Sequence, residues 1–395
     1  METKLSTGTI SKPDTKLSII FNTHIPYVLQ SDSNFHEQEN WIFEAITETY
    51  IPLLNILSEL GEKEHKNDII LSFTPCTLKQ ITEGKDKYIK HLQILRDVAL
   101  SEIERTSSLD EYNKYQKHPV DLSDEELLSV HNSAIFYYER IKTSLDFFET
   151  TNVVEFIKNI KNIQLWTSTP NHNFLPIYND NTIEHFIKRG ISDFEDMFNR
   201  KPDGFWLPEC AYKPGIEDIL LKNGIKSTAL NINSIGLFTG QEKSGFYNYK
   251  DLGVYVHDFR ICKFLWKAPT NTIPSDPSYR EFYRDMGLDV TQEYLAKLGL
   301  EKKLNKSSQK GIWTGLKYHS ITGAETRLGD KKVYDVKKAK TRIKKDAERF
   351  FELLDENRNL INDQENFTLA FDSEFFGHWW FEGNWWLEEV LKYEN

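Results

Sequence analysis

The residue types best suited to chemistry are concentrated near the end of this 395-residue chain. An apolar run, Asn366–Phe371, is predicted to form a buried strand, and Asp372 follows it directly. The next residues supply two more acids, one histidine and four tryptophans: Glu374, His378, Trp379, Trp380, Glu382, Trp385 and Trp386. Tryptophan is bulky and its N–H needs a partner, so four of them beside carboxylates are unusual as simple core filling. Aromatic rings next to acids instead favour a cleft that binds sugars.

Three earlier segments are predicted to be strands that end in the same way, with a polar side chain just beyond the strand. They are 16–22 before His24, 163–168 before His172, and 203–208 before Glu209. In an α/β barrel the C-terminal ends of all strands open on one face. We therefore expect the two histidines, Glu209 and Asp372 to converge on that face.

Two carboxylates from different strands are what the cleavage of a glycosidic bond requires. One forms a covalent glycosyl intermediate, and the other protonates the leaving oxygen and then deprotonates the acceptor. With water as the acceptor, the sugar is hydrolysed. With a sugar hydroxyl as the acceptor, in a water-poor cleft lined by Trp206, Trp379 and Trp380, the chain is transferred instead.

The elements that must position these residues alternate between strand and helix, which predicts an α/β fold. Other strands are predicted at 69–73, more weakly at 225–232 and 254–259, and as a possible strand end at 315–319.

Helical patterns fill the remaining chain. Amphipathic helices are predicted from Trp41 to Leu57, with a kink or local break at Pro52, and from Asp335 to Leu360. Between about 77 and 159 the patterns are helical only, and Ser123–Glu126 matches a capping box. We therefore expect a polar tail at 1–15 and one barrel domain at 16–395, with a helical insertion at about 77–159.

Composition excludes several classes of function. The formal net charge of −11 and a pI near 5.6 disfavour a nucleic-acid partner. The three cysteines, Cys76, Cys210 and Cys262, are too few and too widely spaced for a disulfide framework or a metal motif. No apolar run approaches the ~20 residues that span a bilayer, and the segment from Met1 to Lys16 is polar, without an apolar h-region. We expect a cytoplasmic protein with no cofactor, no metal and no membrane partner.

Several segments resemble glycoside hydrolase family 57, most closely its 1,4-α-glucan branching enzymes. The most specific are WLPECAY at 206–212, FDSEFFGHWWFEG at 371–383 and HIP at 24–26. Further likeness runs through EAITETYIPLL at 44–54, NHNFLP at 171–176, YREFYRDMG at 279–287 and GLKYHSITG at 315–323.

The resemblance implies an incomplete TIM-type barrel, (β/α)7, and a retaining mechanism with Glu209 as nucleophile and Asp372 as general acid/base. It also implies that His24 and His172 line the sugar site. The expected substrate is an α-glucan such as glycogen, starch, amylose or a maltooligosaccharide, cut at α-1,4 links and rejoined through α-1,6 links or hydrolysed as by an α-amylase. Trp206, His378, Trp379 and Trp380 are expected to contact it.

The chain also departs from the family pattern. Gln164 replaces a usual acid, Asn231–Ser234 replaces an Asp-x-His-Gly segment, His257–Asp258 replaces an Arg-Asp pair, and Thr272–Ser275 replaces a glycine-rich turn. The chain ends soon after Trp386, whereas relatives continue into a helical domain that closes the cleft. We expect that C-terminal domain to be absent.

Two other functions remain open from the sequence. His24, His172 and Asp372 could hold a metal, as in barrel hydrolases and deacetylases. The altered contact segments also allow a glucan-binding protein without catalysis. Each candidate residue also has a purely structural alternative. Glu209 and Asp372 could be ordinary charged residues at strand ends, His24 and His172 could be structural histidines with satisfied hydrogen bonds, and Glu374 could be a supporting or solvated acid. The tryptophans could belong to the core, with Trp385 and Trp386 packed beneath the cleft.

Overall fold

The computed structural model describes residues 16–30, 38–234, 244–257, 262, 265, 275–300, 313–360 and 366–393. The predicted tail at 1–15, and the departures at Asp258 and at 272–274, lie outside these residues. No helix in the described ranges is both long and apolar enough to cross a membrane.

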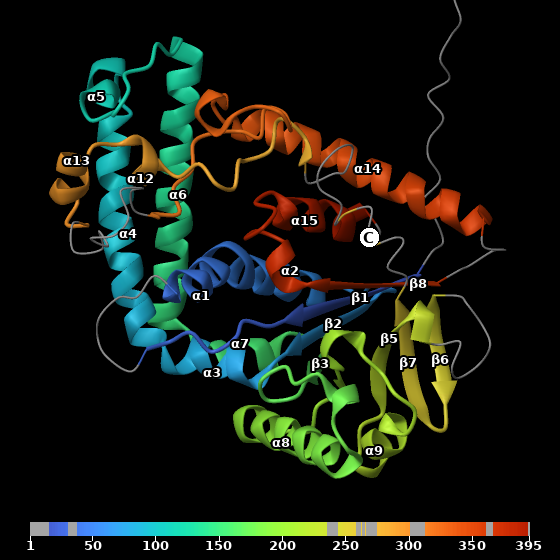
Figure 1. The fold of residues 1–395 in the computed structure, drawn as a ribbon. Coiled ribbons are helices and arrows are strands. Elements are labelled where there is room, and N and C mark those ends of the chain that lie inside the picture. The colour runs from blue at the N-terminus through green and yellow to red at the C-terminus, as the bar shows by residue number, and fades with distance from the viewer. Residues whose placement is uncertain are drawn as a thin grey trace, which may run out of the picture.

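Seven parallel strands form a closed barrel. They are β1 (Lys16–Thr23), β2 (Asp68–Phe73), β3 (Gln164–Thr167), β4 (Gly204–Phe205), β5 (Ser227–Asn231), β7 (Leu252–His257) and β8 (Asn366–Asp372). Their order is β5-β4-β3-β2-β1-β8-β7, and pairing of β5 with β7 closes the ring. The predicted fold class, a seven-stranded α/β barrel with a helical insertion, is confirmed. Figure 1 shows β1, β2 and β8 side by side, with their arrowheads directed toward α1 (Glu39–Ala45).

Large side chains fill the barrel interior. The central cluster comprises Ile20, Ile70, Trp166, Trp206, Cys210, Ala229 and Tyr255. Trp166 donates its indole N–H to Gln164, which in turn donates to the Tyr255 hydroxyl. Gly204 makes room for the Trp166 ring, because a Cβ at this position would lie 2.3 Å from it. The interior is therefore packed, and the strand ends above it are left to form a site.

The predicted helix from Trp41 to Leu57 is interrupted by one π-helical turn. The chain runs through α1, the π-helix η1 (Ile46–Tyr50) and α2 (Ile51–Gly61), with Pro52 in the first turn of α2. Proline has no N–H and clashes with the preceding turn, so it disrupts the regular helix. The expected kink at Pro52 is therefore present as a change of helix type.

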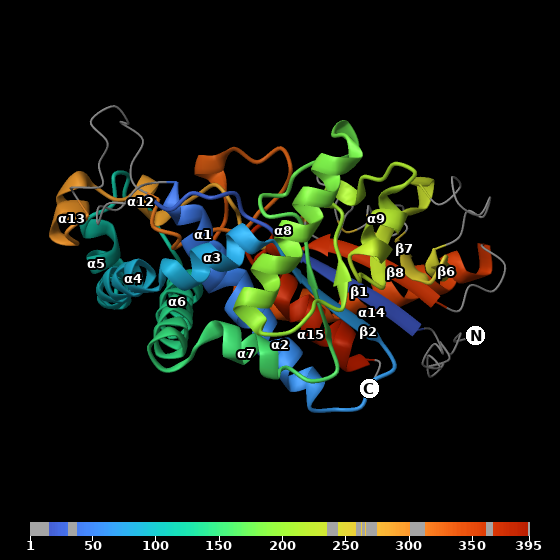
Figure 2. The ribbon, with the colours of Figure 1, turned by 90° about the horizontal axis from the view of Figure 1, so that it is seen from below.

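Other helices cover the barrel and extend beyond it. Between β2 and β3 the chain forms α3 (Pro75–Glu83), α4 (Lys85–Arg105), α5 (Leu109–Lys114), α6 (Asp124–Thr150) and α7 (Val153–Asn159). The predicted capping box at Ser123 and Glu126 is confirmed at the start of α6. In Figures 1 and 2, α4 and α6 lie side by side at one end of the molecule, away from β6 (Gly245–Tyr249) at the other.

The outer layer of the barrel is completed by α8 (Asp180–Phe198), α9 (Ile216–Lys222), α14 (Val336–Leu360) and α15 (Gly383–Tyr393). The predicted amphipathic helix ending at Leu360 corresponds to α14. Figure 1 shows α8 and α9 on one side of the strands and α14 with α15 on the opposite side.

The possible strand end at 315–319 is not a strand, so this prediction is wrong. The helices α12 (Met286–Asp289) and α13 (Gln292–Lys297) precede this region, and α14 follows it. Its described residues are mostly irregular and include only the short helix η6 (Leu328–Asp330) and isolated bridges at His319 and Ser320. The Asp285 carboxylate accepts from the backbone N–H groups of Thr314 and Gly315. A side chain thus supplies hydrogen bonds that a sheet would otherwise give.

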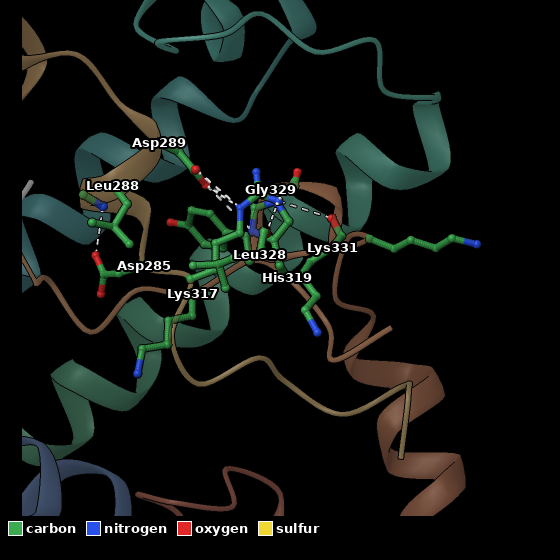
Figure 3. Close-up of polar contacts among 12 residues, drawn as sticks. Asp285, Leu288, Asp289, Lys317, His319, Leu328, Gly329 and Lys331 are labelled. Carbon is green, nitrogen blue, oxygen red and sulfur yellow. Dashed lines mark hydrogen bonds and ion pairs between the residues drawn. The ribbon is translucent and has the colours of Figure 1, made fainter. Parts of the chain in front are cut away.

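Arg284 also fixes this irregular region through hydrogen bonds. Its guanidinium donates to Asp289 and to the carbonyls of Leu328, Gly329 and Lys331 (Figure 3). These contacts fix the wall of a polar hollow of about 350 Å³ that is also lined by Tyr112 and Gln116. Two lysines beside this hollow are likewise engaged: Lys117 donates to the Leu288 carbonyl, and Lys331 pairs with Glu281.

Candidate active site

The ends of β1 and β8 are joined by three consecutive contacts. Asn22 Nδ2 donates to Asp372 Oδ1 at 3.2 Å, and the hydroxyls of Thr23 and Ser373 lie 2.7 Å apart. The backbone N–H of His24 then donates to Glu374 Oε1 at 3.2 Å. The parallel pairing of β1 with β8 therefore continues through side chains beyond the strands, and it fixes the position of Asp372.

Two histidines and Glu209 come together on the same face. The rings of His24 and His172 stack with their centroids 4.1 Å apart and an angle of 9° between their planes. His172 Nε2 lies 3.3 Å from Glu209 Oε1. His24 follows β1, His172 follows β3, and Glu209 lies in the short helix η3 (Pro208–Cys210) after β4, so three strand ends meet here.

Three residues at this face have a left-handed backbone that side chains disfavour. The φ angles are 56° at His172, 60° at Glu209 and 51° at Cys210. Each such residue costs on the order of 1–3 kcal/mol and persists only where its surroundings enforce it, often at functional sites. The strained turn aims the Glu209 side chain outward, where it is 71% exposed.

Burial shifts the protonation of the groups around Glu209. It lowers the pKa of both His24 and His172 to about 4, so both rings are neutral near pH 7. Burial also raises the pKa of Asp372; the Asn22 hydrogen bond opposes this rise, and the negative charge of Glu209 adds to it. Asp372 is thus biased toward holding a proton and Glu209 lies open to solvent, which is the division of labour that an acid and a nucleophile need.

Glu374 is buried rather than solvated. It accepts a hydrogen bond from the Tyr50 hydroxyl as well as from His24 N–H. Burial, opposed by the Tyr50 hydrogen bond and reinforced by the charge of Asp372, raises the pKa of Glu374 to about 8. From the sequence, Glu374 could be either a supporting or a solvated acid. The structure shows it buried close to Asp372, and with a pKa of about 8 it is mostly protonated near pH 7.

Several buried polar atoms at this face have no hydrogen-bond partner among the described residues. They are Nδ1 of His24, Nδ1 of His172 and Nε1 of Trp206. Unpaired buried polar groups are costly, and they are common where a ligand or water supplies the partner. Trp206 is itself 5% exposed, so only its edge is available to a ligand.

The aromatic residues of the final motif divide into exposed and buried members. Trp379 is 46% exposed, whereas Trp380 is 2% exposed and packs against Phe375 and Trp386. The expectation that Trp380 lines an open cleft is therefore corrected: the turn after η7 (Ser373–Phe375) directs this ring into the core. Trp386 is buried as expected.

His378 also faces inward. It is buried, its Nδ1 lies 3.6 Å from Glu44 Oε2, and its ring meets the edge of Phe282. Burial lowers the pKa of His378 to about 4. His378 thus lies in a buried polar network next to Trp379, and its expected contact with substrate stays a prediction.

The proposed metal set of His24, His172 and Asp372 does not assemble. Stacked imidazoles direct their nitrogen lone pairs along parallel planes, which does not suit a shared ion. Among the described residues the only three ligand atoms close enough to share an ion belong to Glu44, Glu48 and His378. Arg280 pairs with Glu48 at 2.9 Å, so one carboxylate of this second set already has a cation as its partner.

Sequence reasoning missed three contributors to the site. Asn22 could have been predicted from the sequence, because it alternates with Ile20 and His24 along the strand and is therefore a polar residue on the inward-facing side. Tyr50 lies in a helix and carries no local signal. The exposed aromatic pair Tyr27 and Phe174, in the segments that follow β1 and β3, was also missed.

The departures from the family pattern lie at different depths. Gln164 pairs with Ile70, which also pairs with Ile20. It precedes Trp166 by two residues along β3, so its side chain lies deeper in the barrel than the strand ends. Gln164 is therefore an interior residue rather than a residue of the open face. Asn231 and His257 face each other at the ends of β5 and β7.

A closed α/β barrel with acids at the ends of separate strands is an architecture suited to glycosidic chemistry. Residues 18–257 match glycosyl hydrolase family 57, and the chain belongs to this family. The resemblance seen in the sequence is thereby confirmed.

Individual relatives are similar over nearly the whole chain. A 1,4-alpha-glucan branching enzyme of Thermococcus kodakarensis is 28% identical over 95% of this chain and 55% of its own length. A probable 1,4-alpha-glucan branching enzyme of Mycobacterium tuberculosis is 23% identical over 95% of this chain and 67% of its own length. The chain thus spans about half the length of the first relative.

Solved structures show the same fold. The alpha-amylase AmyC of Thermotoga maritima superimposes with a TM-score of 0.81 at 28% identity, covering 96% of this chain and 71% of that one. A branching enzyme of this family from Pyrococcus horikoshii gives a TM-score of 0.73 at 26% identity, covering 96% and 67%.

Proposed function

We propose that this protein is a retaining α-glucan-active enzyme with Glu209 as nucleophile and Asp372 as general acid/base. The observation that carries the proposal is the pairing of an exposed Glu209 on a strained turn with a partly buried Asp372 of raised pKa, from separate strands of one face. Two carboxyl groups from separate strands, one exposed and one whose pKa is raised by burial, meet the requirement for a two-step displacement.

In this mechanism Glu209 attacks the anomeric carbon while Asp372 protonates the leaving oxygen. Asp372 then removes a proton from the acceptor as the glycosyl intermediate is released. The neutral ring of His172 donates from Nε2 to Glu209 in the tautomer that carries a proton there, and this fixes the carboxylate for attack. Its stacking on His24 holds that ring in place.

The proposed substrate is a polymeric α-glucan. Four large aromatic or phenolic side chains on loops and helices beyond the strand ends remain exposed, at 55%, 39%, 43% and 46%: Tyr27, Trp41, Phe174 and Trp379. Three of these residues, Tyr27, Phe174 and Trp379, follow β1, β3 and β8, and flat rings beside the strand ends suit successive sugar rings of a chain. Because the relatives include named branching enzymes, we propose formation of α-1,6 links from α-1,4 chains, with alpha-amylase-like hydrolysis as the alternative.

The test is incubation of the purified protein with amylose, with iodine colour, reducing ends and α-1,6 links followed together. Branching predicts loss of colour with new α-1,6 links and few new reducing ends. Loss of colour with rising reducing ends and no branches would establish hydrolysis instead. Glycogen binding without turnover would show a glucan-binding protein that lacks catalysis.

Two variants test the assignment of the acids. Glu209→Gln and Asp372→Asn should each lower turnover by about a thousandfold or more, since each removes one of two essential groups. Asp196→Asn, an equivalent change at an exposed position on α8, is the matched control and should retain full activity. Undiminished turnover of Glu209→Gln would remove it as the nucleophile.

We propose that the protein works in a reducing cytoplasm. Cys76 and Cys210 are buried and form no disulfide bond within the described part of the chain, which supports this location.

A further inference from the structure

The π-helix η1 contacts the segment after β8 through three consecutive residues. The Glu48 carbonyl accepts from Asn384 Nδ2 at 2.6 Å, and Thr49 Oγ1 accepts from His378 N–H at 3.1 Å. The Tyr50 hydroxyl donates to Glu374 Oε1. One short turn therefore holds the segment from Glu374 to Asn384 at three points.

The availability of the Glu48 carbonyl follows from the sequence. In a regular helix this oxygen accepts from the N–H of the residue four positions later, which here is Pro52. Proline has no N–H, so that bond cannot form and the carbonyl can serve another donor. Asn384 supplies the donor.

Gly377 lets the two segments approach closely enough for these contacts. A Cβ at this residue would lie 1.9 Å from the Glu48 carbonyl oxygen, and its φ of 111° suits glycine only. Pro52, Gly377 and Asn384 are thus three parts of one docking arrangement, although Pro52 is far from the other two in the chain.

This arrangement leads directly to the candidate acid. Glu374 lies two residues after Asp372 and joins Tyr50 of η1 to the backbone of His24. Asp372 is held on its other side by Asn22. A shift of the docked segment would therefore move the Asp372 carboxyl relative to Glu209 and the histidines.

We propose that Pro52 is a positioning residue for proton transfer: by releasing the Glu48 carbonyl to Asn384, it fixes the segment that places Glu374 and Asp372. The inference rests on the proposed function of Asp372. π-Helical turns recur at functional sites, where they re-aim side chains. Pro52 itself contacts no reacting group, so its effect passes through the docked segment.

The test compares Pro52→Ala, Asn384→Ala and the double variant with the unmodified protein. Pro52→Ala restores an N–H that competes for the Glu48 carbonyl. We expect kcat on amylose to fall about tenfold with KM within about twofold, because misplacement of a reacting group affects chemistry more than binding. Since both substitutions act on one carbonyl, the double variant should be no slower than the slower single variant.

A second readout does not depend on activity. Hydrogen exchange of the His378 and Trp379 amides should become at least about tenfold faster in Pro52→Ala, while global stability changes little. Pro214→Ala, at an exposed proline before α9, is the control for the loss of a proline and should alter neither readout.

The outcomes separate the two proposals. If the unmodified protein turns over amylose but Pro52→Ala keeps both its kcat and its slow exchange, the positioning role is overturned and the catalytic assignment stands. If exchange quickens as expected while the unmodified protein and Glu209→Gln are equally inactive, the catalytic proposal fails and the docking arrangement remains. Additive losses in the double variant would show that Pro52 and Asn384 act separately, which contradicts the inference.

Discussion

Glu209 occupies a backbone conformation that glutamate does not favour. Its φ is 60°, its side chain is largely exposed, and its neighbours His172 and Cys210 share the left-handed conformation. An exposed side chain gains little from packing, so the strain at Glu209 is not offset by its own contacts. Function explains the residue better than stability does.

This strain can be measured by replacing Glu209 with glycine and with alanine. At an ordinary position glycine is about 0.5–1 kcal/mol less stable than alanine. At residue 209 we expect the opposite order, with Glu209→Gly about 1 kcal/mol more stable than Glu209→Ala, because glycine adopts positive φ without strain. Urea denaturation of both variants checks this, and the usual order would contradict a strained turn. Both variants should be inactive.

Glu374 should make stability depend on pH. Its pKa is about 8 in the folded protein and near 4.5 when exposed, so between these values only the folded state retains the proton. Stability then falls as pH rises, by up to about 1.4 kcal/mol per pH unit, and levels off above the folded pKa. Glu374→Gln lacks this titration, so its stability relative to the unmodified protein should increase from about pH 4.5 to 8. A constant difference across that range, measured by urea denaturation, would show that Glu374 is not protonated in the folded state.

Among the structural elements, β4 is the shortest strand of the barrel and packs against its largest interior residue. Gly204 of β4 pairs with Trp166 of β3, and a Cβ at Gly204 would lie 2.3 Å from the Trp166 ring. Gly204→Ala should therefore cost about 2–3 kcal/mol by overpacking. In a Trp166→Leu background, where the ring is absent, the same change should cost less than about 1 kcal/mol.

Gly329→Ala is the matched control for this element, because a Cβ there meets nothing within 4 Å. It should change stability by no more than about 0.5 kcal/mol. Equal costs for Gly204→Ala in the presence and absence of the Trp166 ring would contradict the packing explanation.

The elements that the sequence predicted are those whose signals are local. The apolar runs of β1, β2 and β8, the capping box of α6 and the helix-breaking Pro52 all act within a few residues. β6 was missed because the two-residue turn that joins it to β7 is Lys250–Asp251, and both residues have positive φ without a glycine to mark the turn.

The failures depend on contacts from distant segments. Leu316 and Tyr318 alternate like a strand, but Tyr318 reaches Glu102 on α4 and the segment is held by Asp285. For the site, strand ends indicated His24, His172, Glu209 and Asp372. The roles of Tyr50, Asn384 and the inward-facing Trp380 depend on how η1 meets the end of the chain, and no local pattern encodes that.

At the scale of the whole molecule, Arg280 joins four parts of the chain that are distant in sequence. Its guanidinium donates to Glu48 of η1 and to Tyr137 of α6, and it lies 3.8 Å from the Phe381 ring centroid. Its backbone N–H donates to Glu382 at 2.9 Å. The barrel helices, the helical insertion and the final motif are thus connected at one buried cation.

Removal of its partner carboxylate should weaken this junction more than removal of the whole pair. Glu48→Gln leaves Arg280 buried without its closest counter-charge, which costs about 3–5 kcal/mol. Glu48→Gln combined with Arg280→Met replaces the pair by neutral groups and should recover most of that loss. The Glu48 carbonyl is retained in both variants, so the docking of Asn384 is not directly altered.

Urea unfolding followed by helical circular dichroism and by tryptophan fluorescence provides the measurement. Coincident transitions that move together would show that the pair connects the insertion to the barrel. If the double variant is as unstable as Glu48→Gln, the loss comes from the missing hydrogen bonds of Glu48 rather than from an uncompensated charge.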